Sequence, residues 1–263
     1  MPPADGDKED RGRVLVVAAA RDVPGAAILA GVAALRAGAG KLCIAAATPA
    51  VTAIGTLVPE CRAVPYTPAS IAAVLREPFD AILVGPGMAP SSGLAAFVHR
   101  VHRMHPATLV LDAGGLAALR DGPLPGLGPS RCVITPHAGE MAKLMDVDKA
   151  HVRAHAHETA LCAAQALGAV VVLKGSSTWI ADPEGRLWHH QARTIGLATS
   201  GSGDTLAGLV AGLAARGASP AQAAVHGVFV HARAGARAAR RHGPLGALAR
   251  ELAPEVPALL ATA

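Results

Sequence analysis

The chain has 263 residues, of which 51% are hydrophobic but only 2% aromatic, and its formal net charge is +5. A chain of this length can bury a large apolar core. So few aromatic rings argue against the base-stacking surface of proteins that bind single-stranded nucleic acids. The densest basic cluster fits a solvated helix face better than a functional basic patch; it comprises Arg233, Arg237, Arg240 and Arg241. We therefore expect no nucleic-acid partner.

The sequence also bears on the cellular compartment. The N-terminal segment MPPADGDKEDRGR is charged and has no apolar run of the kind found in signal peptides. Apolar runs such as VLVVAAA are too short to span a bilayer. The four cysteines are widely spaced with apolar flanks, which predicts buried thiols in a reducing compartment rather than disulfides or a zinc site. We expect a soluble, cytoplasmic protein without a membrane partner.

In chain order, residues 1–12 are polar and are predicted to be a disordered tail. Short β-branched runs then alternate with longer Ala-rich helical stretches. Strands that are hydrophobic on both faces, each followed by a helix, predict a mostly parallel sheet covered on both sides. The expected strands span 13–19, 41–47, 81–85, 108–113, 131–136 and 169–175. The expected helices span 25–38, 68–76, 91–105, 138–145 and 149–167.

The pattern changes after Lys174. The segments TWIAD and RLWHH flank the turn signal ADPEGR, which predicts an antiparallel hairpin at the edge of the sheet. The remaining residues are almost all helical in pattern, over 204–216, 220–241 and 245–261. We expect one α/β domain over residues 13–263, with a helical C-terminal flank.

The strongest local signal is TSGSGDTLAGLVAG, residues 199–212. Gly201 and Gly203 allow positive φ and bring bare backbone N–H groups together where a helix begins. Such a site favours phosphate, because the backbone donors and the helix dipole act together. Asp204 follows in the first turn, where its carboxylate is suited to take a proton from a substrate hydroxyl. Ser202 and Asp204 equally fit a simple helix cap, so this segment alone leaves both interpretations open.

Further candidate residues lie at or near the ends of expected strands. Lys174 closes a buried strand, where its ammonium can neutralise a phosphate or can simply reach solvent. His137, in TPHAGE, can bind a ligand, although a lone histidine also fits a structural role. Asp112, in LVLDAGG, can bind Mg²⁺ or ligand hydroxyls. Gly87, in VGPGM, permits close approach of a ligand to the main chain, and the small side chain of Ala26 leaves room for a planar ligand.

Two familiar kinds of site are not indicated. The glycines match neither G-x-G-x-x-G nor a Walker A loop. His99, His102 and His105 recur along one expected helix, but the third is rotated away and no cysteine or carboxylate completes a zinc set.

Together, these segments resemble the NAD(P)H-hydrate dehydratase family, a carbohydrate-kinase-like family. The resemblance runs from about Arg13 to the final helix and rests on PGAA, GPGM, LDAGGLAAL, TPHAGE, VLKGSST and GSGDTLAG. It implies a ribokinase-like fold. It also implies a hydro-lyase that uses ADP or ATP with Mg²⁺ to dehydrate the S epimer of hydrated NADH and NADPH (NADHX and NADPHX).

The resemblance also implies roles for individual residues. The nucleotide phosphates are expected on Lys174, Gly175, Ser176, Ser177 and Thr178 and on the nest of Gly201, Ser202 and Gly203. The hydrated dinucleotide is expected to contact Ala26, Gly87, His137 and Asp204, with Asp204 as the catalytic base. Mg²⁺ is expected to be held mainly by the nucleotide phosphates. A homotetramer and a separate epimerase acting in the same pathway are also implied.

The chain departs from the family pattern at two places. Ala138 stands where the family usually has proline, and DAGGL replaces DADAL, which weakens any role of Asp112 as a metal ligand. Two other functions fit part of the pattern. A small-molecule kinase of the same fold would release a phosphorylated product instead of inorganic phosphate. A non-catalytic nucleotide sensor would have no need of Asp204.

Overall fold

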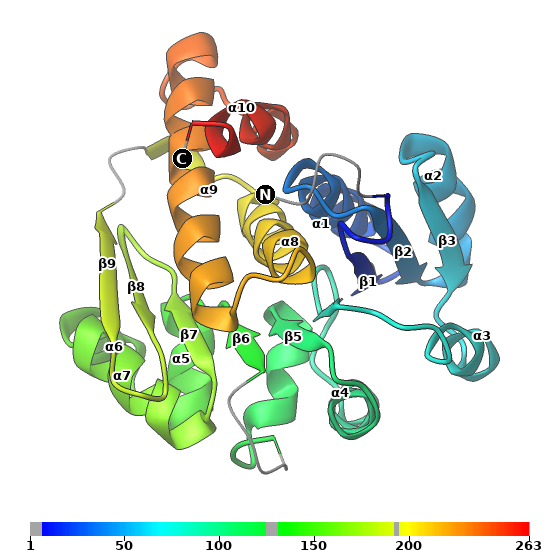
Figure 1. Cartoon of the computed structure of the whole chain (residues 1–263). Coiled ribbons are helices and arrows are strands. Elements are labelled where there is room, and N and C mark those ends of the chain that lie inside the picture. The colour runs from blue at the N-terminus through cyan, green and yellow to red at the C-terminus, as the bar shows by residue number, and fades with distance from the viewer. Residues whose placement is uncertain (1–6, 125–130, 192–194, 263) are drawn as a thin grey trace.

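The computed structural model describes residues 7–124, 131–191 and 195–262. Its centre is a nine-stranded sheet in the order β3-β2-β1-β4-β5-β6-β7-β8-β9 (Figure 1). The pairs from β3 to β7 are parallel, and β8 and β9 are antiparallel. The strands are β1 (Arg13–Val17), β2 (Lys41–Ala46), β3 (Cys61–Pro65), β4 (Ala81–Val84), β5 (Thr108–Leu111), β6 (Cys132–Ile134), β7 (Val170–Leu173), β8 (Ser177–Ala181) and β9 (Leu187–Gln191).

Helices cover both faces of this sheet (Figure 1). One layer contains α1 (Pro24–Arg36), α2 (Val51–Leu57), α8 (Ser202–Ala215), α9 (Pro220–His242) and α10 (Val256–Leu260). The other contains α3 (Pro68–Val74), α4 (Ser92–Met104), α5 (Ala138–Met145), α6 (Lys149–Ala154) and α7 (Ala156–Leu167). Alternate residues of one strand serve the two cores: Val14 and Val16 join the first, and Leu15 and Val17 the second. The predicted α/β architecture is confirmed.

Small residues let the helices of the first layer approach closely. All of α8 is buried except Gly203 and Asp204. A Cβ at Gly208 would lie 2.1 Å from the carbonyl oxygen of Ala30 in α1, and one at Gly212 would lie 2.5 Å from that of Ala34. Close backbone contact therefore replaces the large rings that the chain lacks.

The structure corrects several expected elements. The edge strand β3 and the short helix α2 were not predicted, because β3 is only half-buried and gives no clear apolar run. The helix expected over 149–167 is divided between α6 and α7 at His155, whose φ of −122° and ψ of 43° are not helical. The helix expected over 245–261 is mostly 3₁₀ turns, η4 (Ala249–Glu251) and η5 (Ala253–Glu255), before α10. Pro254 and Pro257 lack the N–H that a continuous helix needs.

The expected disordered tail also needs correction where it is described. Residues 1–6 lie outside the described residues, but residues 8–11 form a turn. The Gly40 N–H donates to the carbonyl oxygen of Gly12 at 2.9 Å, and Glu9 forms ion pairs with Arg13 and Lys41. These contacts join the segment to the start of the sheet.

The cysteines also differ in part from expectation. Cys43 and Cys132 are buried, but Cys61 is only half-buried and Cys162 is exposed. In the described part of the chain, no helix combines the length and hydropathy required for a membrane span.

Candidate active site

The candidate residues meet at the carboxyl edge of the parallel strands. Gly87 follows β4, Asp112 follows β5, His137 follows β6 and Lys174 follows β7. Because these four strands are neighbours in the sheet, the residues form a row along the edge where α/β proteins bind ligands. The pairing of β6 and β7 extends past the strands, with the Lys174 N–H donating to the carbonyl oxygen of Pro136 at 2.8 Å.

A buried carboxylate anchors the ammonium of Lys174. Lys174 Nζ donates to Asp112 Oδ1 at 2.9 Å, and Thr135 Oγ1 donates to the same oxygen at 2.6 Å. Asp112 is 3% exposed and Thr135 is fully buried. We considered Asp112 as a ligand for Mg²⁺ or hydroxyl groups, but the structure commits this oxygen to Lys174 and Thr135. The contact between Asp112 and Lys174 instead positions the lysine ammonium.

Asp204 is the second carboxylate of this centre. Burial raises its pKa to about 6; the negative charge of Asp112 adds to the rise, and the ammonium of Lys174 opposes it. A carboxylate with a pKa near 6 is a stronger base than an ordinary aspartate, yet it is mostly ionised at neutral pH. Those properties suit a general base.

The turn before α8 shapes the anion nest. Gly201 has φ of +86°, a backbone conformation that favours glycine. A Cβ there would also lie 2.4 Å from Leu29 Cδ1, so the leucine side chain would have to shift. A Cβ at Gly203 would lie 3.3 Å from Lys174 Nζ, so the bare Gly203 leaves room for that ammonium. The Ser202 N–H is already bonded to the Thr199 carbonyl oxygen at 3.3 Å. The nest is therefore smaller than the sequence suggests.

A cavity of about 770 Å³ opens beside this nest. Its polar lining residues are His137, Lys174, Gly175, Ser176, Thr178, His190, Thr199, Ser202, Gly203 and His231. Its apolar lining residues are Ile195, Leu197, Ala198, Leu206, Val228 and Ala232. Phosphates suit the polar residues, and a flat nucleobase suits the apolar ones.

The cavity gathers most of the residues expected to bind nucleotide, but not all of the candidates. Ser177 and Gly201 are not in its lining. Ser177 begins β8, whose side chains alternate between the two faces of the sheet. Asp204 also lies outside the lining, although its charge interacts with that of Lys174, which lines the cavity.

Ala26 and Gly87 lie together at a different point of the same edge. A Cβ at Gly87 would be 2.6 Å from the Cβ of Ala26, so the first turn of α1 and the segment after β4 are in contact. They meet where β1 and β4 are neighbours and their following helices cover opposite faces, which is the switch point of the sheet. A Cβ at Gly85 would lie 1.9 Å from the carbonyl oxygen of Asp112, so Gly85 makes room for the chain itself. The contact of Gly87 with a ligand stays a prediction.

His137 begins α5 as its N-cap. Its Nδ1 accepts the N–H groups of Gly139 and Glu140 at 3.0 and 3.1 Å, and the Glu140 carboxylate accepts the His137 N–H at 2.8 Å. The structural role that we left open for this histidine is therefore present. Because Nδ1 accepts, the ring proton is on Nε2, and this side chain also lines the cavity.

Sequence reasoning missed the rest of the cavity wall. His190, on β9, and His231, on α9, are isolated histidines that no motif distinguishes from the other histidines of the chain. The apolar residues, such as Leu197 and Val228, resemble ordinary core positions. Only the packing of α9 against β8, β9 and η3 (Ile195–Leu197) brings them to the nest.

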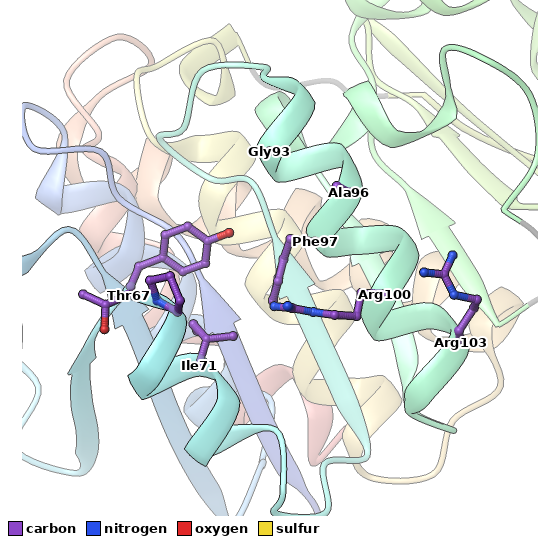
Figure 2. A pocket seen from close by; sticks show the side chains of 9 residues that line it. Thr67, Ile71, Gly93, Ala96, Phe97, Arg100 and Arg103 are labelled. Carbon is purple, nitrogen blue, oxygen red and sulfur yellow. The ribbon is translucent and has the colours of Figure 1, made fainter.

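A second cavity, of about 380 Å³, lies between α3 and α4. Ile71 of α3 faces Phe97 and Arg100 of α4 across it (Figure 2). The Thr67 hydroxyl at its rim is used within the chain, where it accepts the Ser70 N–H at 3.3 Å. This cavity contains none of the predicted site residues and no carboxylate among its described lining. It therefore lacks a general base.

Among the residues that the structure describes, no three His, Cys, Asp or Glu side chains come together as a metal site.

Comparison with known proteins adds a family. A family model described as NAD(P)H-hydrate dehydratase matches residues 14–258. The chain is 46% identical to an ADP-dependent (S)-NAD(P)H-hydrate dehydratase of Xanthomonas campestris, over 99% of this chain and 92% of that protein.

Two solved structures are also similar. The ADP/ATP-dependent NAD(P)H-hydrate dehydratase of Bacillus subtilis, co-crystallised with ATP and Mg²⁺, has a TM-score of 0.89 at 31% identity and covers 100% of this chain and 94% of its own. A ribokinase-like superfamily protein of Enterococcus faecalis has a TM-score of 0.85 at 24% identity, covering 100% and 91% of the two chains. The second likeness concerns the fold alone, which is ribokinase-like as predicted.

Proposed function

The chain belongs to the NAD(P)H-hydrate dehydratase family, and on this basis we propose that it dehydrates the S epimer of NADHX and NADPHX at the expense of ADP or ATP. One arrangement of side chains supports this activity at the site described above. Asp204, a carboxylate with a raised pKa, interacts electrostatically with the ammonium of Lys174. Lys174 is bonded to the buried carboxylate of Asp112 and lines a cavity large enough for a nucleotide.

In this proposal the nucleotide occupies the 770 Å³ cavity. Its phosphates lie against Lys174, the turn of Gly175 and Ser176, Thr178, and the first turn of α8. Its base lies against apolar lining residues such as Leu197 and Val228. Lys174 neutralises phosphate charge, and the N-terminus of α8 adds its dipole.

The hydrated dinucleotide lies along the row formed by Ala26, Gly87 and His137. His137 also lines the nucleotide cavity, so it lies at the boundary between the two ligands. The strand order supports this arrangement, because Gly87 follows β4, whereas most strand and strand-end residues of the cavity follow β7 or belong to β8 and β9. Asp204 and Lys174 then stand where the two ligands meet.

The chemistry follows from this arrangement. Asp204 removes the proton of the substrate hydroxyl while the hydroxyl oxygen attacks the terminal phosphorus of the nucleotide. AMP is the leaving group when the nucleotide is ADP, and ADP is the leaving group when it is ATP. The phosphate ester is a better leaving group than hydroxide. Loss of inorganic phosphate and of a proton from the neighbouring carbon restores the dihydropyridine double bond.

Mg²⁺ belongs to the proposal as an ion that arrives with the nucleotide phosphates. The similar enzyme of Bacillus subtilis was crystallised with ATP and Mg²⁺. Because Asp112 Oδ1 is bonded to Lys174 and Thr135, we do not assign Asp112 as a ligand of the metal. When bound, the ion would neutralise part of the phosphate charge.

The predicted homotetramer remains part of the proposal. Three exposed apolar side chains, Phe229 of α9 and Leu245 and Leu248 after it, support a subunit contact. A separate epimerase and a cytoplasmic location stay predictions from the sequence.

The test is a dehydration assay. Purified protein is mixed with S-NADHX, Mg²⁺ and either ADP or ATP, and formation of NADH is followed by its absorbance. A rise that requires nucleotide, and that disappears in Asp204→Asn, supports the dehydratase and identifies its phosphate donor. If folded protein produces no NADH with either nucleotide, the proposal is wrong, and phosphorylated products of small alcohols should be sought.

A further inference from the structure

His231 makes a contact with the nest that the proposed chemistry does not use. It lies in the middle of α9, is 8% exposed, and lines the nucleotide cavity. Its Nε2 is 3.0 Å from the backbone carbonyl oxygen of Ser202 and 3.1 Å from the Ser202 hydroxyl oxygen. One ring nitrogen therefore contacts both oxygen atoms of the first residue of α8.

The location of the ring proton follows from these partners. A carbonyl oxygen can only accept, so Nε2 must carry the hydrogen at that contact. The ring stays neutral, because burial, aided by the ammonium of Lys174, lowers the pKa of His231 to about 4, although the bond to the Ser202 carbonyl opposes this change. Nδ1 therefore has no proton, and the Nε2–H is shared between the two oxygens of Ser202.

This tautomer determines what the Ser202 hydroxyl can do. Its oxygen receives the histidine N–H, so its own hydrogen must point to another acceptor. Ser202 is 5% exposed and lines the cavity together with Lys174 and Gly203. Phosphate oxygens are acceptors only, and a hydroxyl whose hydrogen is already turned toward them loses little rotational entropy on binding.

We propose that His231 is a positioning residue that turns the Ser202 hydroxyl into a dedicated donor to the nucleotide phosphate. This inference rests on the proposed placement of the nucleotide phosphates at the N-terminus of α8. His231 acts through Ser202 and has no role in proton transfer.

The test uses two substitutions of His231 that differ mainly in reach. In His231→Gln the amide nitrogen can take the place of Nε2, whereas in His231→Asn the shorter side chain cannot reach Ser202. Ser202→Ala and the double variant Ser202→Ala with His231→Asn complete a cycle. Binding of MgADP is measured by calorimetry without substrate, and steady-state dehydration and thermal unfolding are measured in parallel.

We expect His231→Asn to weaken MgADP binding about tenfold, as expected for loss of a hydrogen bond to a charged group. KM for ADP should rise similarly, while kcat at saturating ADP stays within about twofold, because Asp204 is untouched. His231→Gln should retain most of the affinity. In the Ser202→Ala background, His231→Asn should cause little further loss.

Two results would overturn the inference. One is a double variant whose loss of affinity is the product of the single losses. The other is His231→Gln binding as weakly as His231→Asn while both unfold at the wild-type temperature, which would indicate a packing role. Wild-type protein that binds MgADP but does not dehydrate S-NADHX would contradict the proposed function alone. Wild-type protein that binds no MgADP would contradict both.

Discussion

At the scale of single residues, the site depends on three charges of alternating sign. Asp112 is buried and bonded to Lys174, and Asp204 lies within the field of both. The same contacts that fix the ammonium also place a second negative charge near the proposed base. Its basicity is thus a property of the group rather than of Asp204 alone.

This coupling predicts the pH dependence of the reaction. Because the pKa of Asp204 is about 6 in the free protein, kcat/KM should fall below that pH, by about tenfold per pH unit once the base is mostly protonated. Initial rates taken immediately after mixing across this range test it. In Asp112→Asn the fall of kcat/KM on the acid side should move to lower pH, because the negative charge of Asp112 that raises the pKa of Asp204 is gone. If the acid side of the kcat/KM profile does not move, Asp112 does not influence the titrating group.

The raised pKa also predicts a cost in stability. The folded-state pKa of Asp204 is above its ordinary value of 3.8, so folding favours the protonated form, and stability falls as pH rises through the interval from 3.8 to about 6. Asp204→Asn removes this cost. With a discount for partial exposure, we expect about 1 kcal/mol more stability at pH above 7 and about 2–4 °C in Tm. Below pH 4 the difference should vanish. Thermal unfolding that shows the same difference at both pH values would contradict it.

The sequence located the charged centre better than the cavity wall. Lys174, Ser202 and Gly203 could be predicted because a strand end and a glycine-rich turn have recognisable chemistry. The contact between His231 and Ser202 could not, because it joins residues 29 positions apart through the packing of two helices. The role of Asp112 was also hidden, since an acid at a strand end does not reveal which cation it meets.

At the scale of elements, the helices next to the site begin in different ways. His137 caps α5 through its side chain and a reciprocal bond from Glu140, whereas α8 begins at Gly201 with no side-chain cap. Ala138, where related chains usually have proline, is the first residue of α5.

Ala138→Pro should therefore stabilise the protein. Proline suits the first position of a helix, and His137 already has the extended φ of −84° and ψ of 171° that a residue before proline prefers. We expect a gain of about 0.4–1 kcal/mol from the less flexible unfolded chain. Denaturant unfolding measures it, and Ala138→Gly, which should lose stability, is the matched control. A loss in Ala138→Pro would mean that the turn cannot accept the ring.

The same scale shows why some elements were predicted and others were not. The strands of the buried centre, β1, β4, β5 and β7, are continuous apolar runs, so their pattern is unambiguous. β3 is half-buried at the edge and includes the exposed Arg62, which removes that pattern. The break between α6 and α7 has neither proline nor glycine to mark it, and only the local geometry of His155 reveals it.

At the scale of the whole molecule, the helical layer that contains α8 and α9 combines a tightly packed interior with exposed apolar side chains. In the layer containing α8 and α9, glycine and alanine make tight internal contacts, and α8 is almost completely covered. Yet several large apolar side chains near the outer end of α9 remain exposed, with Leu245 79% and Leu248 44% exposed. Large apolar side chains that are exposed near one another can mark a surface that another protein covers.

A subunit contact at that end of the molecule gives a direct prediction. The wild-type protein should elute with about four times the 26.3 kDa mass of one chain when its mass is measured by light scattering after gel filtration. Leu245→Glu together with Leu248→Glu should lower that mass, because burial of two carboxylates in an apolar contact is unfavourable. Leu57→Glu, which is 65% exposed on α2, is the matched control and should leave the mass unchanged. A monomeric wild type, or a mass reduced only by the control, would place the exposed leucines outside any subunit contact.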